Sequence, residues 1–343
     1  MHFSGKAALL GLAALLSCLL SLTGFYEQTE ALARARLEEG RMRNVVVLPR
    51  PEPPQPSAVL PLAAALPASD GAAEEEEPLA AVWGRATDAD IRETTITGGL
   101  YIKNETGYRI DMDQLLAEGS RVRLPAEGAQ ILIVHTHGSE AYTPAGLDRY
   151  EANDTSRTED TQYNVIRVGD ELAALLEAQG LRVIHDRGIY DYPSYTGSYT
   201  RAGEAIERCL AENPGIAVVI DLHRDALGTD GVVYKTMAEE QGTVASQIML
   251  LVGTDDSGLE HPNWRSNLSL ALYLQAAVSE KHPTLMRPVD LVPQRYNQHL
   301  TGGSLILEVG SSGNTLQEAL AAIRLFADAA GPALAALADS PTP

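Results

Sequence analysis

The sequence predicts an α/β protein in which a mostly parallel sheet is flanked by helices. Short apolar runs such as QILIVH and IAVVIDLH alternate, along residues 131–338, with amphipathic segments of helical length. Strands that are buried on both faces read as continuous apolar runs, and strands that alternate with helices are typical of a parallel sheet covered on both sides. We expect a transmembrane helix and a disordered linker to precede this domain.

Residues 1–26 form the predicted membrane anchor. Residues 7–22 carry no charge, and Lys6 supplies a positive flank. An apolar run of this kind is close to the roughly 20 residues that a membrane-spanning helix needs. Cleavage as a signal peptide near the small residues at 31–33, and lipidation at Cys18, are the alternatives. In each case the rest of the chain is exported.

Two segments separate the anchor from the main domain. Residues 27–90 are rich in Pro, Ala and Glu and include the acidic run Glu74–Glu77. Proline removes backbone donors and like charges repel, so we expect an extracytoplasmic linker without a core. Residues 91–130 suggest a small lead-in with a short strand, a turn and a helix. The catalytic domain is predicted over residues 131–338.

Local signals place the elements of this domain. Asn164 is a suitable N-cap and Gly180 a suitable stop for the helix between them. The predicted elements are, in chain order, a strand at 130–135, a helix at 164–180, a strand at 181–186, a helix at 200–214, a strand at 216–223, a hairpin leading into 245–253, a helix at 264–281, a strand at 304–310 and a helix from Thr315.

Composition excludes several classes of function. With 46 acidic and 26 basic residues, the net charge of -20 repels phosphate backbones, which excludes nucleic-acid binding. Two cysteines, Cys18 and Cys209, make no disulfide framework and no Cys-based zinc site. The sequence contains no G-x-S-x-G nucleophile motif and no phosphate-binding glycine loop.

Three predicted strands carry polar residues near their ends. His135 ends QILIVH, His223 ends AVVIDLH, and Glu308 lies near the end of SLILEVG, while His137 and Glu140 follow the first strand closely. The carboxyl ends of parallel strands lie on one edge of the sheet, so these residues can meet there. Two histidines and one carboxylate, with a fourth position for water, are typical of a catalytic Zn²⁺ site.

Other residues have roles that follow from this site. Glu308 suits the general base, which takes a proton from water and passes it to a leaving amine. Asp221 lies two residues before His223 and either orients that imidazole or is simply a buried hydrogen-bond acceptor. For the remaining histidines we expect hydrogen-bonded structural roles. These are His185, His261 and His282.

Several motifs, in order over about residues 131–320, resemble the stage II sporulation protein P family. They include IVHTHGSEAYTP, VVIDLHRDA, RYNQHL and LILEVGSSGNTLQEA. The resemblance implies a fold like that of zinc N-acetylmuramoyl-L-alanine amidases. It also implies a peptidoglycan hydrolase that cuts the muramic acid to stem-peptide bond and peptide cross-links during septal wall degradation and engulfment in sporulation. It further implies, as partners, a lytic transglycosylase and a polytopic membrane protein.

The resemblance assigns the metal ligands to His135, Glu140 and His223, and the catalytic acid to Glu308. His137 is an alternate ligand, because His137-Gly-Ser-Glu140 has the H-x-x-E spacing of zinc carboxypeptidases. In amidases the carboxylate ligand begins a helix, which leaves two further candidates. These are Glu159 and Asp160.

Polar residues near these motifs are candidates for substrate binding. Arg224 either binds substrate carboxylates or pairs with its neighbour Asp225. Arg295, Asn297 and Gln298 form a polar loop suited to peptide or sugar groups. His299 stands where the family often has an acid. The expected location is the cell membrane, with a single span and an extracytoplasmic catalytic domain; a wall-binding scaffold and a zinc carboxypeptidase are the alternative functions.

Overall fold

The computed structural model describes most of the chain after residue 89, namely residues 90–96, 100–145, 156–229 and 232–338. The predicted anchor at 1–26 and nearly all of the predicted linker at 27–90 lie outside these ranges, so both stay predictions. Within the ranges, no helix combines the length and the apolar character that crossing a bilayer requires.

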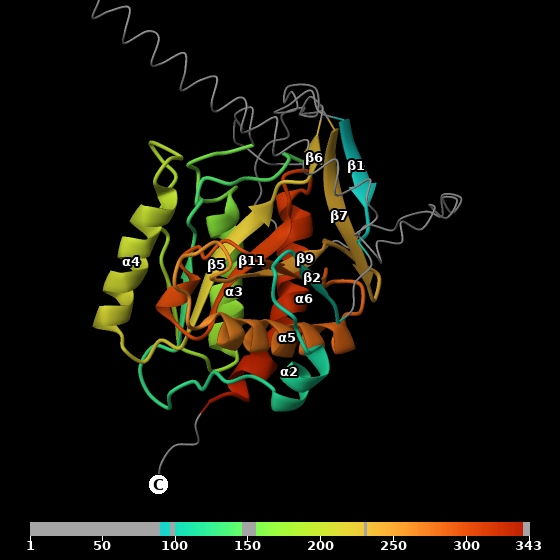
Figure 1. The fold of residues 1–343 in the computed structure, drawn as a ribbon. Helices are drawn as coiled ribbons and strands as arrows, with labels where there is room; N and C mark the ends of the chain where they lie inside the picture. The colour runs from blue at the N-terminus through green and yellow to red at the C-terminus, as the bar shows by residue number, and fades with distance from the viewer. Residues whose placement is uncertain (1–89, 97–99, 146–155, 230–231, 339–343) are drawn as a thin grey trace, which may run out of the picture. The chain divides into compact units, whose positions relative to one another are not determined.

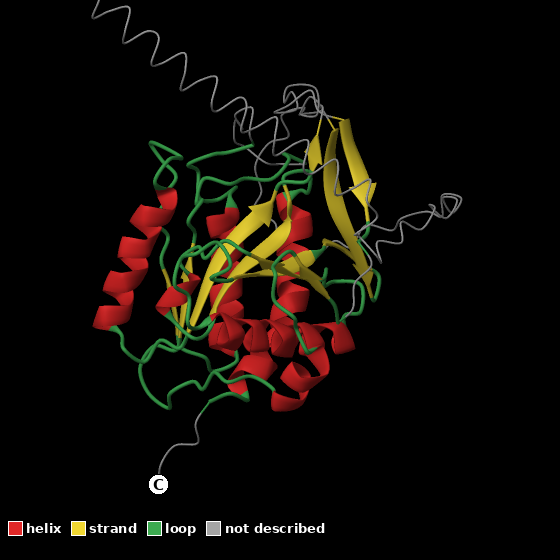
Figure 2. Ribbon diagram, viewed as in Figure 1, coloured by secondary structure: helices red, strands yellow, loops and turns green. Residues whose placement is uncertain are grey.

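A sheet of seven strands organises the described structure (Figures 1 and 2). From one edge to the other the strands are β2 (Ile102–Asn104), β10 (Val289–Val292), β9 (Ile248–Gly253), β11 (Ser304–Ser311), β5 (Val218–Asp225), β3 (Ile131–Val134) and β4 (Val183–His185). Strand β2 comes from the predicted lead-in at 91–130. Part of that segment therefore belongs to the main sheet.

The strands of this sheet run in two directions. Strands β4, β3, β5 and β11 are parallel to one another, and so are β9, β10 and β2, but β9 and β11 pair antiparallel. A parallel neighbour needs a crossover, whereas an antiparallel neighbour can start at the edge where the previous strand ended. Strand β9 starts at the edge where β5 ended, and β11 starts at the opposite edge, where β10 ended. Five of the six strand pairs in this sheet are therefore parallel, and the antiparallel pair of β9 and β11 makes it a mixed sheet.

The segment between β5 and β9 builds most of a second sheet. It contains β6 (Gly228–Thr229), β7 (Val232–Glu240) and β8 (Thr243–Ser246). Strands β7 and β8 form an antiparallel hairpin, and β1 (Asp90–Thr94) pairs parallel with β7. The hairpin that the sequence predicts before the apolar strand at 245–253 is thus present.

Helices cover the two faces of the seven-stranded sheet. Helices α3 (Val165–Ala178), α5 (Trp264–Lys281) and α6 (Leu316–Ala335) share one large core with one face. Helix α4 (Ser198–Glu212) packs on the other face, where Ile206 contacts a smaller cluster that includes Leu132 and Val219. The short helices are α2 (Met112–Glu118) and the 3-10 helix η2 (Gln298–Leu300).

Capping residues explain where the long helices begin and end. The side chain of Asn164 accepts a hydrogen bond from the backbone N–H of Ile166, as its predicted N-cap role requires. Gly180 follows α3 with a φ of 85°, a left-handed conformation that glycine adopts readily. At α6, Thr315 and Glu318 form a reciprocal capping box.

Two of the three histidines with expected structural roles are hydrogen-bonded. His185 lies 3.1 Å from Asp170, and His282 lies 3.0 Å from Asp328. His261 differs, because it is only 1% exposed and neither ring nitrogen has a hydrogen-bond partner in the described part of the chain.

We expect His261 to make the protein less stable in acid. Burial, with the nearby ring of His299, lowers the pKa of His261 from 6.5 to about 4. Through this window the unfolded chain binds a proton that the folded protein does not, so stability is lost as the pH falls. His261→Phe should reduce the acid loss by about 1–3 kcal/mol in urea unfolding compared between about pH 7 and 4.5. An unchanged pH dependence would contradict this role.

Candidate active site

One face of the seven-stranded sheet carries the candidate catalytic groups. Side chains alternate between the two faces along a strand. Val219 of β5 packs with α4, so Asp221 and His223 point to the same side. Glu308 of β11 is the register partner of His223 and therefore shares that side. These two strand ends form the base of the site.

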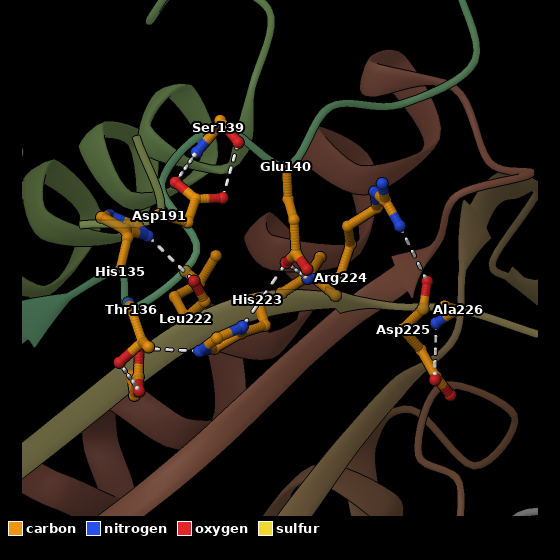
Figure 3. Close-up of polar contacts among 12 residues, drawn as sticks. His135, Thr136, Ser139, Glu140, Asp191, Leu222, His223, Arg224, Asp225 and Ala226 are labelled. Carbon is orange, nitrogen blue, oxygen red and sulfur yellow. Dashed lines mark hydrogen bonds and ion pairs between the residues drawn. The ribbon is translucent and has the colours of Figure 1, made fainter. Parts of the chain in front are cut away.

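His135 lies on the opposite face. It continues the row of Ile133, which belongs to the core shared with α3, and it is fully buried. Its Nδ1 lies 2.9 Å from the carbonyl oxygen of Leu222 (Figure 3), and its Nε2 lies 2.8 Å from Nε2 of His185. The assignment of His135 as a metal ligand is therefore corrected, because both ring nitrogens bond away from His223.

His137 takes the position that was expected for His135. The chain turns directly after β3, and Thr136 fixes this turn by donating from its N–H and Oγ1 to the Asp221 carboxylate, at 2.8 and 2.6 Å. The ring of His137 lies 5.2 Å from the ring of His223 and nearly perpendicular to it. His137 is buried, and within the described ranges its Nδ1 has no hydrogen-bond partner. That nitrogen is available as a ligand.

Glu140 is the carboxylate next to His223. Its Oε2 lies 3.4 Å from Nδ1 of His223 and accepts a hydrogen bond from the backbone N–H of Arg224 at 3.2 Å (Figure 3). The alternative candidates, Glu159 and Asp160, are exposed. The geometry therefore favours Glu140 among the three.

The imidazole of His223 is held between two buried carboxylates. Its Nε2 lies 2.8 Å from Oδ1 of Asp221, while its Nδ1 faces Glu140. Burial acts to lower the pKa of His223, but the Asp221 and Glu140 carboxylates outweigh this effect and raise the pKa well above its ordinary value. Burial acts to raise the pKa of Glu140, but the contact with His223 and nearby positive charge lower it to about 2.

Glu308 is the further carboxyl group of the site. Its residue is partly exposed, but its Oε2 is buried and has no hydrogen-bond partner among the residues described. Burial raises the pKa of Glu308 to about 8; the charge of His223 opposes this rise, and the carboxylates of Asp225 and Glu140 add to it. A carboxyl group that titrates close to neutrality is suited to general acid–base catalysis.

Two tyrosines contact His137, and a third contacts one of these two. Tyr195 stacks on its ring, with centroids 4.6 Å apart and planes 12° apart, and Tyr199 meets it edge-on at 5.3 Å. Tyr296 lies 5.3 Å from Tyr199, and its φ of 51° is left-handed, which costs a side chain of this size about 1–2 kcal/mol. Such strain is often found at functional sites. Tyr195 remains 60% exposed, so much of its side chain is accessible to solvent.

Two predicted substrate-binding residues have structural contacts instead. Arg224 is buried, and its guanidinium donates to the carbonyl oxygens of Ala141 and Ser156. Gln298 is also buried, and its side-chain amide bonds to backbone groups at the end of β9, at 2.8 and 3.0 Å. Both residues hold chain segments together, which corrects their assignment to substrate.

Arg295 and Asn297 also bind backbone groups. Nδ2 of Asn297 donates to the carbonyl oxygen of Tyr199 at 2.8 Å, and Arg295 donates to that of Glu260 at 3.1 Å. The residue between them, Tyr296, is the one in this loop that packs on the site face of the sheet. The role of Arg295 and Asn297 in substrate binding stays a prediction.

The cluster offers ligands rather than a preformed metal site. Across the described ranges, no three His, Cys, Asp or Glu side chains already stand in an arrangement that holds an ion. The chemistry of His137, Glu140 and His223 nevertheless fits zinc, with Asp221 on the far nitrogen of His223. Burial lowers the pKa of His137 to about 4, so its ring is neutral at neutral pH, as a metal ligand must be.

Comparison with known proteins identifies the family. The sequence profile of Stage II sporulation protein P (SpoIIP) matches residues 75–331. The chain belongs to the stage II sporulation protein P family. Stage II sporulation protein P of Bacillus subtilis (strain 168) is 28% identical over 213 residues, which cover 58% of this chain and 49% of that protein. The chain spans about half the length of the curated SpoIIP that it matches.

Solved structures of amidases are distantly similar. AmiC2 of Nostoc punctiforme has a TM-score of 0.37 and 11% identity, and covers 62% of this chain and 98% of its own. Ami1 of Mycobacterium smegmatis has a TM-score of 0.36 and 13% identity, with 61% and 97% covered. The CwlD amidase of Clostridioides difficile, solved with the GerS lipoprotein, has a TM-score of 0.34 and 13% identity, with 60% and 99% covered. TM-scores this low support no conclusion about this SpoIIP-family chain.

Sequence reasoning missed two residues of the site in this SpoIIP-family protein. Arg157 and Asp191 form an ion pair beside Glu140. Neither belongs to a motif with a chemical meaning, and they lie far from each other in the chain. Only the fold brings them to the candidate ligands.

Gly169 should be needed for the contact between His135 and His185. A Cβ at this position of α3 would lie 2.6 Å from Nε2 of each ring. Alanine favours a helix over glycine by about 1 kcal/mol, but overpacking a core typically costs about 1–3 kcal/mol. We therefore expect Gly169→Ala to lower the free energy of unfolding in urea by up to about 2 kcal/mol, the overpacking cost less the gain in helix propensity.

The matched control is Ala174→Gly, at an exposed position of the same helix. It measures helix propensity alone and should cost about 1 kcal/mol. If Gly169→Ala stabilised the protein, the two rings would be free to move aside, and His135 would not be locked in place.

Proposed function

We propose that this SpoIIP-family protein is a zinc-dependent peptidoglycan hydrolase, an N-acetylmuramoyl-L-alanine amidase that also cleaves peptide cross-links. The observation that carries the proposal is the gathering of His137, Glu140, His223 and Glu308 on one face of the sheet. Two imidazoles and one carboxylate, with a further carboxyl group beside them, form the donor set of a catalytic zinc site with a position left for water. The family membership supports a role in wall degradation during sporulation.

The proposal includes a location and partners. Residues 1–26 anchor the protein in the membrane, and its catalytic domain acts on the septal wall outside the cytoplasm during engulfment. A lytic transglycosylase and a polytopic membrane protein work with it. The resemblance of the sequence motifs supports these assignments.

The ligands have distinct supports in the fold. His137, Glu140 and His223 would hold Zn²⁺, which supplies Lewis acidity and makes water more acidic. Asp221 forms an ion pair with Nε2 of His223, and Nδ1 of the same ring faces Glu140. Thr136 in turn binds Asp221 and fixes the turn that carries His137.

Glu308 moves the protons of the reaction. It takes a proton from the attacking water and delivers it to the amine that leaves the cleaved amide. Its pKa of about 8 keeps it protonated at neutral pH until positive charge is added beside it, because positive charge favours the carboxylate. The exposed part of the Tyr195 side chain offers an aromatic contact for a sugar ring of the glycan.

Removing zinc should abolish hydrolysis. Purified protein should release stem peptides from sacculi, lose this activity in a chelator, and regain it when zinc is restored. Mass spectrometry of the products identifies the bond: a freed lactyl group with a free L-Ala amino terminus means an amidase. Loss of a terminal amino acid would instead mean a carboxypeptidase. This is the second candidate function, because His137 and Glu140, which have the H-x-x-E spacing, both lie at the site. Full activity without metal would contradict the proposal.

Glu308→Gln should separate metal binding from catalysis. The variant keeps the size of the side chain but cannot accept a proton, so turnover should fall by about 10²–10⁴-fold, while zinc content measured by elemental analysis stays unchanged. Glu177→Gln, on the exposed surface of α3, is the matched control and should cleave sacculi like the parent. Cleavage by Glu308→Gln at the parent rate would remove Glu308 from the mechanism. A parent protein that binds sacculi without cleaving them would support the scaffold alternative.

A further inference from the structure

Arg157 joins two buried carboxylates next to the candidate ligands. Its Nη2 lies 3.2 Å from Oε1 of Glu140, and its Nη1 pairs with Oδ2 of Asp191. The side chains of Glu140 and Asp191 are 8% and 1% exposed, against 20% for Arg157. Ion pairs on an open surface contribute little because both partners move and are solvated. This arrangement is shielded, so its geometry is restrained.

The contact with Glu140 restrains the orientation of its carboxylate. Arg157 binds Oε1, while Oε2 lies 3.4 Å from Nδ1 of His223 and accepts a hydrogen bond from the N–H of Arg224. Rotating the carboxylate would break the contact with Arg157. A ligand that is already oriented loses less rotational freedom when it binds a cation.

The contact with Asp191 acts on the turn between the two ligands. Asp191 accepts hydrogen bonds from the backbone N–H and from Oγ of Ser139, at 3.1 and 2.6 Å (Figure 3). Ser139 stands between His137 and Glu140 in the chain. Arg157 therefore restrains this turn both through Glu140 and through Asp191.

A third contact links Arg157 to His137. The guanidinium carbon lies 5.1 Å from the centroid of the Tyr195 ring, within the range of a cation–π interaction. The same tyrosine stacks on the ring of His137 at 4.6 Å. Each of the two ligands in the first turn is thus restrained by a contact that leads to Arg157.

We propose that Arg157 is a positioning residue that orients Glu140 and His137 for zinc, with Asp191 as its anchor. The inference rests on the proposed function, since it assumes that these two residues are ligands. A planar guanidinium can contact two carboxylates and an aromatic ring at once, whereas the compact ammonium of lysine cannot. The positive charge of Arg157 repels a cation and would by itself weaken zinc binding. If removing Arg157 lowers the zinc affinity, positioning outweighs repulsion; if removal raises it, repulsion outweighs positioning.

The test is the zinc affinity of the full-length protein, measured by competition with a chromophoric chelator. Loss of residues that orient metal ligands typically weakens binding by about 10–100-fold, and we expect this for Arg157→Gln and for Asp191→Asn. The double variant should bind zinc no more weakly than the weaker of the two single variants, because each substitution breaks the same Arg157–Asp191 pair. Arg157→Lys should recover only part of the affinity. Arg167→Gln, which breaks the 3.0 Å pair with Glu171 on α3, is the matched control and should bind like the parent.

Each outcome has a distinct meaning. Equal or tighter binding by Arg157→Gln, with a parent that binds zinc and cleaves sacculi, would overturn the positioning role alone. Additive losses in the double variant would show that Asp191 is not the anchor of Arg157. A parent that binds no zinc would remove the proposed function itself. Because thermal unfolding of the metal-free variants reports folding separately, Asp191→Asn and Arg157→Lys keep the test valid if Arg157→Gln does not fold.

Discussion

The site depends on the placement of the His223 imidazole between Asp221 and Glu140. A buried carboxylate is costly unless it is paired and hydrogen-bonded. In this protein one imidazole faces both carboxylates, and backbone N–H groups of Thr136 and Arg224 bond to them as well. His223 therefore supports the stability of the fold as well as the chemistry that we propose. A cation held by the same residues would replace the positive charge of the protonated imidazole. The two carboxylates would therefore face a positive charge whether or not the cation is bound.

Local signals in the sequence were sufficient to locate most elements. The cap at Asn164, the start of α6 at Thr315 and the bounds of α5 at Trp264 and Lys281 appear where they were expected. These features depend on residues close together in the chain. The direction of the strands did not follow in the same way, because periodicity reports burial and not the path of the connections. The antiparallel step between β9 and β11 arises from two returns, one at each edge of the sheet, which leave no local pattern in the sequence.

The choice between His135 and His137 illustrates the same limit. Alternation along β5 was enough to place Asp221 and His223 on one face. Relating β3 to β5 requires their register, and a change of one residue moves a whole row of side chains to the other face. The predicted substrate-binding role of Gln298 was wrong for another reason. Its side-chain amide satisfies buried backbone groups, and a fold requires such partners whether or not a ligand is present.

The excursion from Ala226 to Gln247 leaves the seven-stranded sheet and rejoins it at the edge beside Glu308. Because β9 runs against β11, the chain needs no helix to cross back over the sheet at this point. The excursion is nevertheless tied to the layers beneath it, because Ala238 and Ala245 belong to the large core and Thr236 bonds to Asn314. Changes in chain length should therefore be tolerated best at the exposed hairpin turn of Gln241 and Gly242, away from these contacts.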